Sequence, residues 1–159
     1  MGLDMYLIRR KKDLKNKDYW NFDKEDIYWR KANAIHKFLC DNGEEIEEQV
    51  IYKISKENLQ ELLNKCNEVL EKAIVKDGQI QNGSQYKDGE WEPIMQDDKY
   101  IENEEEIKDI LPTQDGFFFG SINYDEYYLQ DIEYTKKEVG FFLETMNFDK
   151  YDCYYLASW

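Results

Sequence analysis

The stretch QVIYKISKENLQELLNKCNEVLEKA, residues 49–73, places a strand pattern directly before a helix pattern. Residues 49–54 are rich in β-branched and aromatic side chains, which is typical of a strand. Ser55 then offers a helix N-cap, and apolar side chains follow at steps of three and four residues. They are Leu59, Leu62, Leu63, Cys66, Val69, Leu70 and Ala73. A strand that runs straight into an amphipathic helix indicates a fold that mixes the two elements.

The N-terminal part of the chain shows the same two patterns. Residues 3–9 alternate as a strand does. Residues 24–41 have apolar side chains on most sides of a helical projection, with a start signal at Asp23 and a stop signal at Gly43. We therefore expect a strand at 3–9 and an enclosed helix over about 24–41.

Residues 76–100 are polar and contain three turn signals, Asp77-Gly78, Asn82-Gly83 and Asp88-Gly89. One of these turns could close a hairpin through Tyr86 or Trp91, but the alternation of side chains around it is poor. We predict a long polar loop excursion here.

The C-terminal part predicts two helices and two strands. Asn103 with Glu106 is a capping-box pattern for a short helix that Pro112 ends. Asn123 with Glu126 is a second capping-box pattern, for a long helix. The remaining segments, 116–122 and 153–159, are predicted to be strands.

Strands and helices mixed in this order favour an α+β fold. We expect an antiparallel sheet of about four strands packed against three main helices, as one two-layer domain over residues 1–159. The length of 159 residues suits a single domain with its own hydrophobic core.

The three cysteines, Cys40, Cys66 and Cys153, have uneven spacing and no histidine cluster beside them. This favours reduced, buried thiols over a disulfide frame or a zinc site. The start of the chain lacks the long apolar stretch of a signal peptide or membrane anchor. We therefore expect a cytoplasmic protein with no metal, no cofactor and no membrane contact.

The net charge of −14 is unevenly distributed. Residues 1–37 hold ten basic and six acidic groups, while residues 38–159 hold 11 basic and 29 acidic groups. Such a field repels duplex DNA from most of the surface and speeds the encounter with basic proteins. The charge could alternatively serve solubility alone.

The predicted helix over 24–41 carries the first candidate site, formed by Arg30, Asn33 and the chain's single histidine, His36. These side chains could bind a nucleotide or a similar anion, with His36 as a base or ligand. The alternative is a structural role, in which His36 and Asn33 are half buried and hydrogen bonded. No second histidine and no obvious nucleophile accompany His36, which favours the structural role.

The second candidate site is the acidic run over residues 97–109. Tyr100 and Ile101 lie between its charges and could form an apolar anchor inside an acidic rim. A solvated helix start is the simpler explanation of the run. The predicted partner-binding residues are Tyr100, Glu102, Glu104, Glu105 and Glu106.

Four blocks of the sequence resemble a family of small proteins encoded by phages and prophages of Gram-positive bacteria. They are GLDMYL (2–7), YWRKANAIHKF (28–38), LPTQDGFFFGSINYDEYYLQD (111–131) and YYLASW (154–159). Small acidic phage proteins of this kind include type II anti-CRISPR proteins, which bind Cas9.

The resemblance implies a phage-encoded inhibitor that acts in the cytoplasm of the bacterial host. Its partner would be Cas9, with or without bound guide RNA, held by protein–protein contact without catalysis. Cas9 handles nucleic acid in positively charged channels, so a chain of charge −14 would be attracted to it. The alternative function is a small phage enzyme, or a protein that binds a nucleotide or anion through the helix of Arg30, Asn33 and His36.

Overall fold

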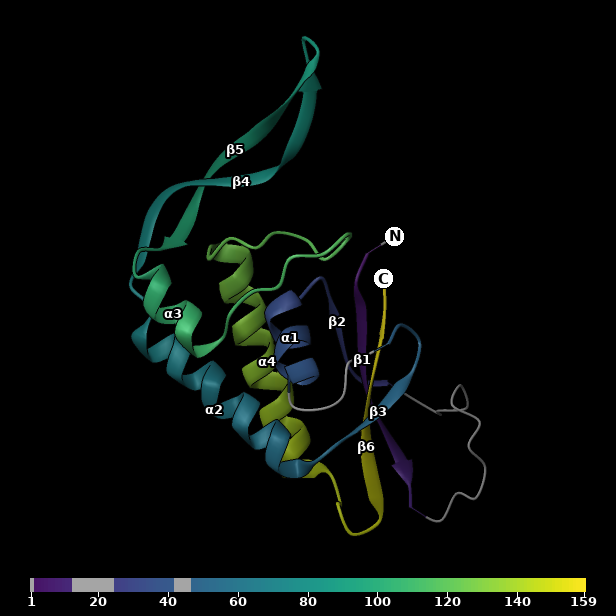
Figure 1. Cartoon of the computed structure of the whole chain (residues 1–159). Coiled ribbons are helices and arrows are strands. Elements are labelled where there is room, and N and C mark those ends of the chain that lie inside the picture. The colour runs from purple at the N-terminus through teal and green to yellow at the C-terminus, as the bar shows by residue number, and fades with distance from the viewer. Residues whose placement is uncertain (1, 13–24, 42–46) are drawn as a thin grey trace.

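The computed structural model describes residues 2–12, 25–41 and 47–159 of the chain (Figure 1). Its main sheet has four antiparallel strands in the order β2-β1-β6-β3. The strands are β1 (Asp4–Lys11), β2 (Glu25–Arg30), β3 (Ile51–Ile54) and β6 (Tyr151–Ser158). The first and last strands along the chain are thus neighbours at the centre of the sheet.

The inner face of the sheet follows from the alternation of side chains in β1. Met5 and Leu7 are fully buried, and they lie opposite Ala157 and Tyr155 of β6, which are also fully buried. Leu3, just before β1, extends this face. The strand predicted over residues 3–9 is therefore confirmed as β1.

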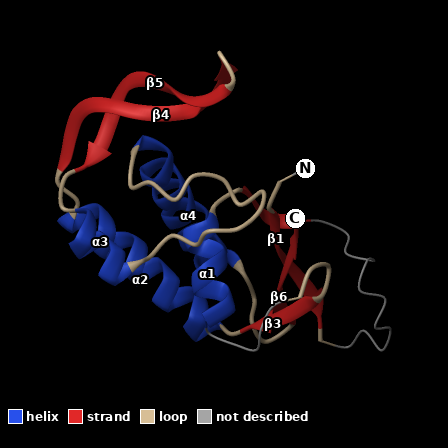
Figure 2. Ribbon diagram, turned by 45° about the horizontal axis from the view of Figure 1, so that its top comes forward, coloured by secondary structure: helices blue, strands red, loops and turns tan. Residues whose placement is uncertain are grey.

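The helices of the described chain gather on one side of the sheet (Figure 2). They are α1 (Asn33–Asp41), α2 (Lys56–Lys72), α3 (Glu104–Ile110) and α4 (Glu126–Thr145). At the start of α2 the Ser55 hydroxyl accepts a hydrogen bond from the Asn58 amide at 3.0 Å, as the sequence predicted. The α+β fold with a four-stranded antiparallel sheet is thus confirmed.

The predicted helix over 24–41 is wrong in its first half, where the structure has strand β2 and a sharp turn. In β2 Trp29 is buried and Tyr28 is exposed, which is the alternation of a strand. Lys31 then adopts a φ of 59°, and α1 begins only at Asn33. The pairing of β2 with β1 is a long-range contact that overrides the helical pattern.

The polar loop predicted over 76–100 is instead a long hairpin of β4 (Val75–Lys87) and β5 (Glu90–Ile101). Its turn has φ values of 51° at Asp88 and 93° at Gly89, the positive pair that a two-residue hairpin turn requires. The hairpin extends away from the rest of the protein (Figure 1). Most of its side chains are exposed on both faces, which explains the poor alternation.

The strand predicted over 116–122 is also wrong, because this segment is a loop. Phe119 is buried, but the Phe117 side chain is 81% exposed. Phe118 and Gly120 have φ values of 72° and 90°, far from the negative φ of regular strand backbone. The fourth strand of the sheet is therefore β2 and not this segment.

Two predicted helix caps differ from the structure. Asn123 does not cap α4; the cap is Asp125, whose carboxylate accepts hydrogen bonds from the first turn. Asn103 is the N-cap residue of α3 but makes no side-chain cap bond. Its amide instead accepts from the Ile74 backbone amide and donates to the Lys72 carbonyl, which fastens α3 to the end of α2.

Two further predictions, the helix start at Asp23 and the stop at Gly43, lie outside the described residues. Among the helices that are described, none has the length and apolar character needed to cross a membrane.

Candidate functional site

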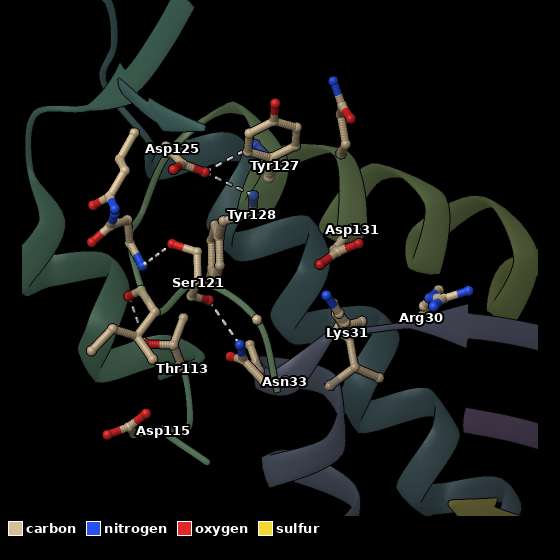
Figure 3. A pocket seen from close by; sticks show the side chains of 18 of the residues that line it. Arg30, Lys31, Asn33, Thr113, Asp115, Ser121, Asp125, Tyr127, Tyr128 and Asp131 are labelled. Carbon is tan, nitrogen blue, oxygen red and sulfur yellow. Dashed lines mark hydrogen bonds between the residues drawn. The ribbon is translucent and has the colours of Figure 1, made fainter. Parts of the chain in front are cut away.

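A pocket of about 740 Å³ opens where three distant segments meet (Figure 3). Its walls are the junction of β2 and α1, the loop that precedes α4, and the first turns of α4; residues 81–83 of β4 also line it. The volume lies within the range of about 300–1,000 Å³ that small-molecule sites occupy.

The backbone on one side of the pocket is held in an unusual conformation. Both Lys31 and Gly120 have positive φ values and pack closely, since a Cβ atom on Gly120 would lie 3.1 Å from the Lys31 Cβ. The Lys31 amide donates to the Leu3 carbonyl at 2.7 Å, and the Leu3 amide donates to the Phe118 carbonyl at 3.2 Å. Strained backbone of this kind persists where surrounding contacts fix it, and it often marks a functional site.

Asn33 connects α1 to the loop. Its amide nitrogen donates to the carbonyls of Phe119 and Ser121, at 3.2 and 2.8 Å. Its amide oxygen accepts from the backbone amide of Gln114 at 3.1 Å. The side chain is 4% exposed and fully engaged, so Asn33 shapes the pocket wall and has no N–H left for a ligand.

Two carboxyl groups of α4 line the pocket. Asp125 is buried; its Oδ1 accepts from the amides of Tyr127 and Tyr128, while its Oδ2 has no hydrogen-bond partner among the described residues. Burial raises the pKa of Asp125. Burial, followed by the nearby charge of Asp125, raises the pKa of Asp131 to about 7. At neutral pH Asp131 can therefore either donate or accept a hydrogen bond.

Arg30 and Lys31 supply positive charge to the same pocket. Both side chains are exposed, and the Arg30 Nε lies 4.0 Å from Asp4 Oδ1, the limit of an ion pair. No ion pair in the described part of the chain involves Lys31. In Figure 3, Arg30 and Asp115 lie at opposite ends of the view. The pocket thus combines cationic and acidic groups.

The structure separates the predicted trio of Arg30, Asn33 and His36. The first two line the pocket, whereas His36 is 2% exposed and does not. The His36 imidazole lies 2.6 Å from the Tyr155 hydroxyl through Nδ1 and 3.4 Å from the Cys40 sulfur through Nε2. Burial lowers the pKa of His36 to about 4, so the ring is neutral at physiological pH. His36 is therefore a buried residue of the core.

The sequence prediction missed Asp131 and Lys31. One signal was available: Asp131 lies three residues after Tyr128 and four before Thr135, both buried in the stripe of α4 that faces the core. A carboxyl group beside such a stripe is unusual enough to mark a candidate site. Cation-binding clusters of histidine, cysteine or acidic residues are absent from the described residues.

The second candidate surface is the hairpin arm, defined as β4, β5 and their turn. Tyr86 and Trp91 face each other across the two strands, with ring centroids 5.5 Å apart. Trp91 is 72% exposed, and Tyr86, Ile94 and Met95 are exposed as well. The sequence pattern indicated Tyr86 and Trp91 only as residues that could flank a hairpin turn. It did not predict that they form an exposed surface.

The predicted acidic site lies at the base of the hairpin arm. Tyr100, near the end of β5, has its ring against Gly78 and is 37% exposed. Ile101 is buried, so Ile101 is not an anchor. Glu102 lies 3.9 Å from the Lys76 ammonium. The remaining predicted residues, Glu104, Glu105 and Glu106, form the exposed first turn of α3.

Comparison with protein-family models, with curated proteins and with solved structures finds no match to this chain.

Proposed function

We propose that this protein binds a basic protein partner through the hairpin arm and the acidic surface at its base. The specific partner we propose is a type II Cas9 effector, which the chain would inhibit by contact and without catalysis, as an anti-CRISPR protein does. The observation that carries the docking proposal is the exposed aromatic pair of Tyr86 and Trp91 on a hairpin that projects from the fold. The choice of Cas9 rests on the resemblance to small phage proteins.

The apolar part of the arm supports a docking role. Trp91, Tyr86 and Met95 are each at least half exposed; Trp91 pairs with Tyr86 across the two strands, and Met95 lies four residues further along β5. Exposed apolar groups that gather on one element are typical of a protein interface. Tryptophan and tyrosine are also the side chains that most often dominate binding energy.

The charge of the arm supports a basic partner. Between residues 75 and 101 the chain holds six acidic and three basic side chains, and the first turn of α3 adds three glutamates. Among the described residues, no ion pair involves Asp88, Glu90 or Glu92 beside the turn. A negative rim around apolar anchors attracts a positive surface and raises its association rate. It also disfavours pairing with a second copy of net charge −14.

The proposal is tested with purified Cas9–guide RNA complexes of more than one subtype. Biolayer interferometry measures binding, and a plasmid-cleavage assay measures inhibition. Trp91→Ala should weaken binding at least tenfold, mainly through faster dissociation. Phe141→Ala is the matched control, because Phe141 is an aromatic residue of α4 that is 65% exposed away from the arm.

The acidic rim is tested with the triple change of Glu104, Glu105 and Glu106 to lysine. It should slow association at low salt and have less effect at high salt, since mobile ions screen exposed charges. If none of the Cas9 complexes binds the wild-type chain, the Cas9 proposal is wrong. If Trp91→Ala and Phe141→Ala bind equally well, the arm is not the docking element.

A further inference from the structure

We propose that the pocket between α1 and α4 binds a mononucleotide, a ligand that joins a hydrogen-bonding base to a phosphate. The proposal rests on the polar groups of the pocket and not on the hairpin tip. It therefore holds or fails independently of binding to Cas9.

The acidic wall of the pocket, formed by Asp125 and Asp131, favours a ligand with hydrogen-bond donors. Asp125 is 3% exposed, and its Oδ2 lacks a partner in the described structure. A buried acceptor without a donor is destabilising, and a ligand N–H group that reaches this oxygen would supply the missing donor. Asp131 lies six residues further along α4 and lines the same pocket. Amino and imino groups of a nucleobase are donors of this kind.

The basic wall calls for an anionic group on the same ligand. Arg30 offers a guanidinium fork with a side chain that is 58% exposed, and Lys31 offers an ammonium group beside it. Arginine binds phosphate through two parallel N–H bonds, and lysine binds it as a point charge. The turn with positive φ at Lys31 fixes the backbone between the sheet and α1 at this wall.

The presence of both acidic and basic side chains disfavours ligands that carry only one kind of charge. A free phosphate would meet three acidic side chains, Asp115, Asp125 and Asp131, which also line the pocket. A purely cationic ligand would be repelled by Arg30 and Lys31. Tyr127, which is 39% exposed at the pocket, offers an aromatic face for a planar base. A ligand with both a donor-bearing base and an anionic group uses all these features.

The test is calorimetric titration of the full chain with AMP, GMP, CMP and UMP. The matching nucleosides and inorganic phosphate are titrated in parallel. At least one mononucleotide should bind with a Kd below about 1 mM and raise the melting temperature. The corresponding nucleoside and phosphate alone should each bind at least tenfold more weakly.

Two variants test the walls separately. Arg30→Ala should weaken the mononucleotide at least tenfold while leaving the nucleoside unchanged. Asp131→Asn should weaken both the mononucleotide and its nucleoside or change the preferred base. Glu133→Gln is the control, because Glu133 is exposed on α4 and does not line the pocket. Circular dichroism confirms that each variant is folded.

Four results would overturn the proposal. The first is that none of the four mononucleotides binds at millimolar concentration. The second is that phosphate alone, or a nucleoside alone, binds as tightly as the mononucleotide. The third is that the folded Arg30→Ala and Asp131→Asn proteins bind like Glu133→Gln. A single-stranded DNA 10-mer that binds more tightly than any mononucleotide would also overturn it, in favour of a nucleic-acid partner.

Discussion

His36 of α1 and Tyr155 of β6 are joined by a hydrogen bond of 2.6 Å between the imidazole Nδ1 and the phenol oxygen. On its other side the ring contacts the Cys40 sulfur, and its edges pack against Phe119 and Trp159. A neutral imidazole has one N–H donor and one acceptor, so it can satisfy both polar contacts at once. His36 thus links the first helix, the last strand and the loop beside the pocket.

The burial of neutral His36 should make the free energy of unfolding depend on pH. Its pKa is about 4 in the folded protein because of burial, against an ordinary value of 6.5. Neutral His36 makes its full contribution to the free energy of unfolding above pH 6.5. This free energy falls by at most about 3 kcal/mol as the pH falls towards 4. His36→Gln should remove this loss. Urea unfolding of both proteins at several pH values measures it, and identical pH dependence in the two would contradict the prediction.

Asp131 should have the opposite pH dependence. Its pKa is about 7 in the fold, mainly because of burial, against an ordinary 3.8. The stabilisation is complete below pH 3.8 and is lost as the pH rises through 7, by at most about 4 kcal/mol. The uncharged Asp131→Asn protein should be more stable than the wild type at pH 8 and similar to it at pH 4. Urea unfolding that shows it less stable at pH 8 would count against this account.

Sequence periodicity predicted an element correctly where the pattern of that segment alone shows which of its faces is buried. In α2, the periodic residues Leu59, Leu62, Cys66 and Val69 are all buried. β3 and β6 begin within about two residues of their predicted starts. In such segments the burial of one face and the local propensity agree, so periodicity alone is sufficient.

The errors arose where a distant partner decides the structure. β2 was misread because its burial depends on β1, and Trp29 donates to Thr135 of α4 across 106 residues. The loop at 116–122 is apolar enough for a strand, but two of its backbone carbonyls accept hydrogen bonds from the Asn33 side chain. The pocket is lined by segments more than 80 residues apart in the sequence. The sequence therefore indicated Arg30 and Asn33 as candidate residues but could not show that Asp131 lines the same pocket.

Gly140, in the middle of α4, offers a stabilising substitution. In the structure the nearest atom to an added Cβ is Leu63 Cδ1 at 4.0 Å, which is ordinary contact. Gly140→Ala should therefore stabilise the protein by about 0.5–1 kcal/mol through helix propensity. Thermal unfolding measures the effect, and a lower melting temperature would show that α4 needs the glycine.

The hairpin turn should respond to substitution at Gly89. This residue has a φ of 93°, and an added Cβ would find open space, with no atom within 4 Å. Any cost of Gly89→Ala therefore comes from the backbone conformation alone, about 1 kcal/mol. Because the arm is exposed, the loss should appear as local opening and not as global unfolding.

Hydrogen exchange distinguishes these two outcomes. Amides of β4 and β5 near the turn should exchange about fivefold faster in Gly89→Ala, since 1 kcal/mol corresponds to roughly that change in an opening equilibrium. Amides of α4 should keep their wild-type rates. Gly89→Asn is the matched variant, because asparagine tolerates a positive φ better than alanine, and it should exchange at an intermediate rate. Equal acceleration in α4 and in the arm would mean that the hairpin unfolds only with the whole protein.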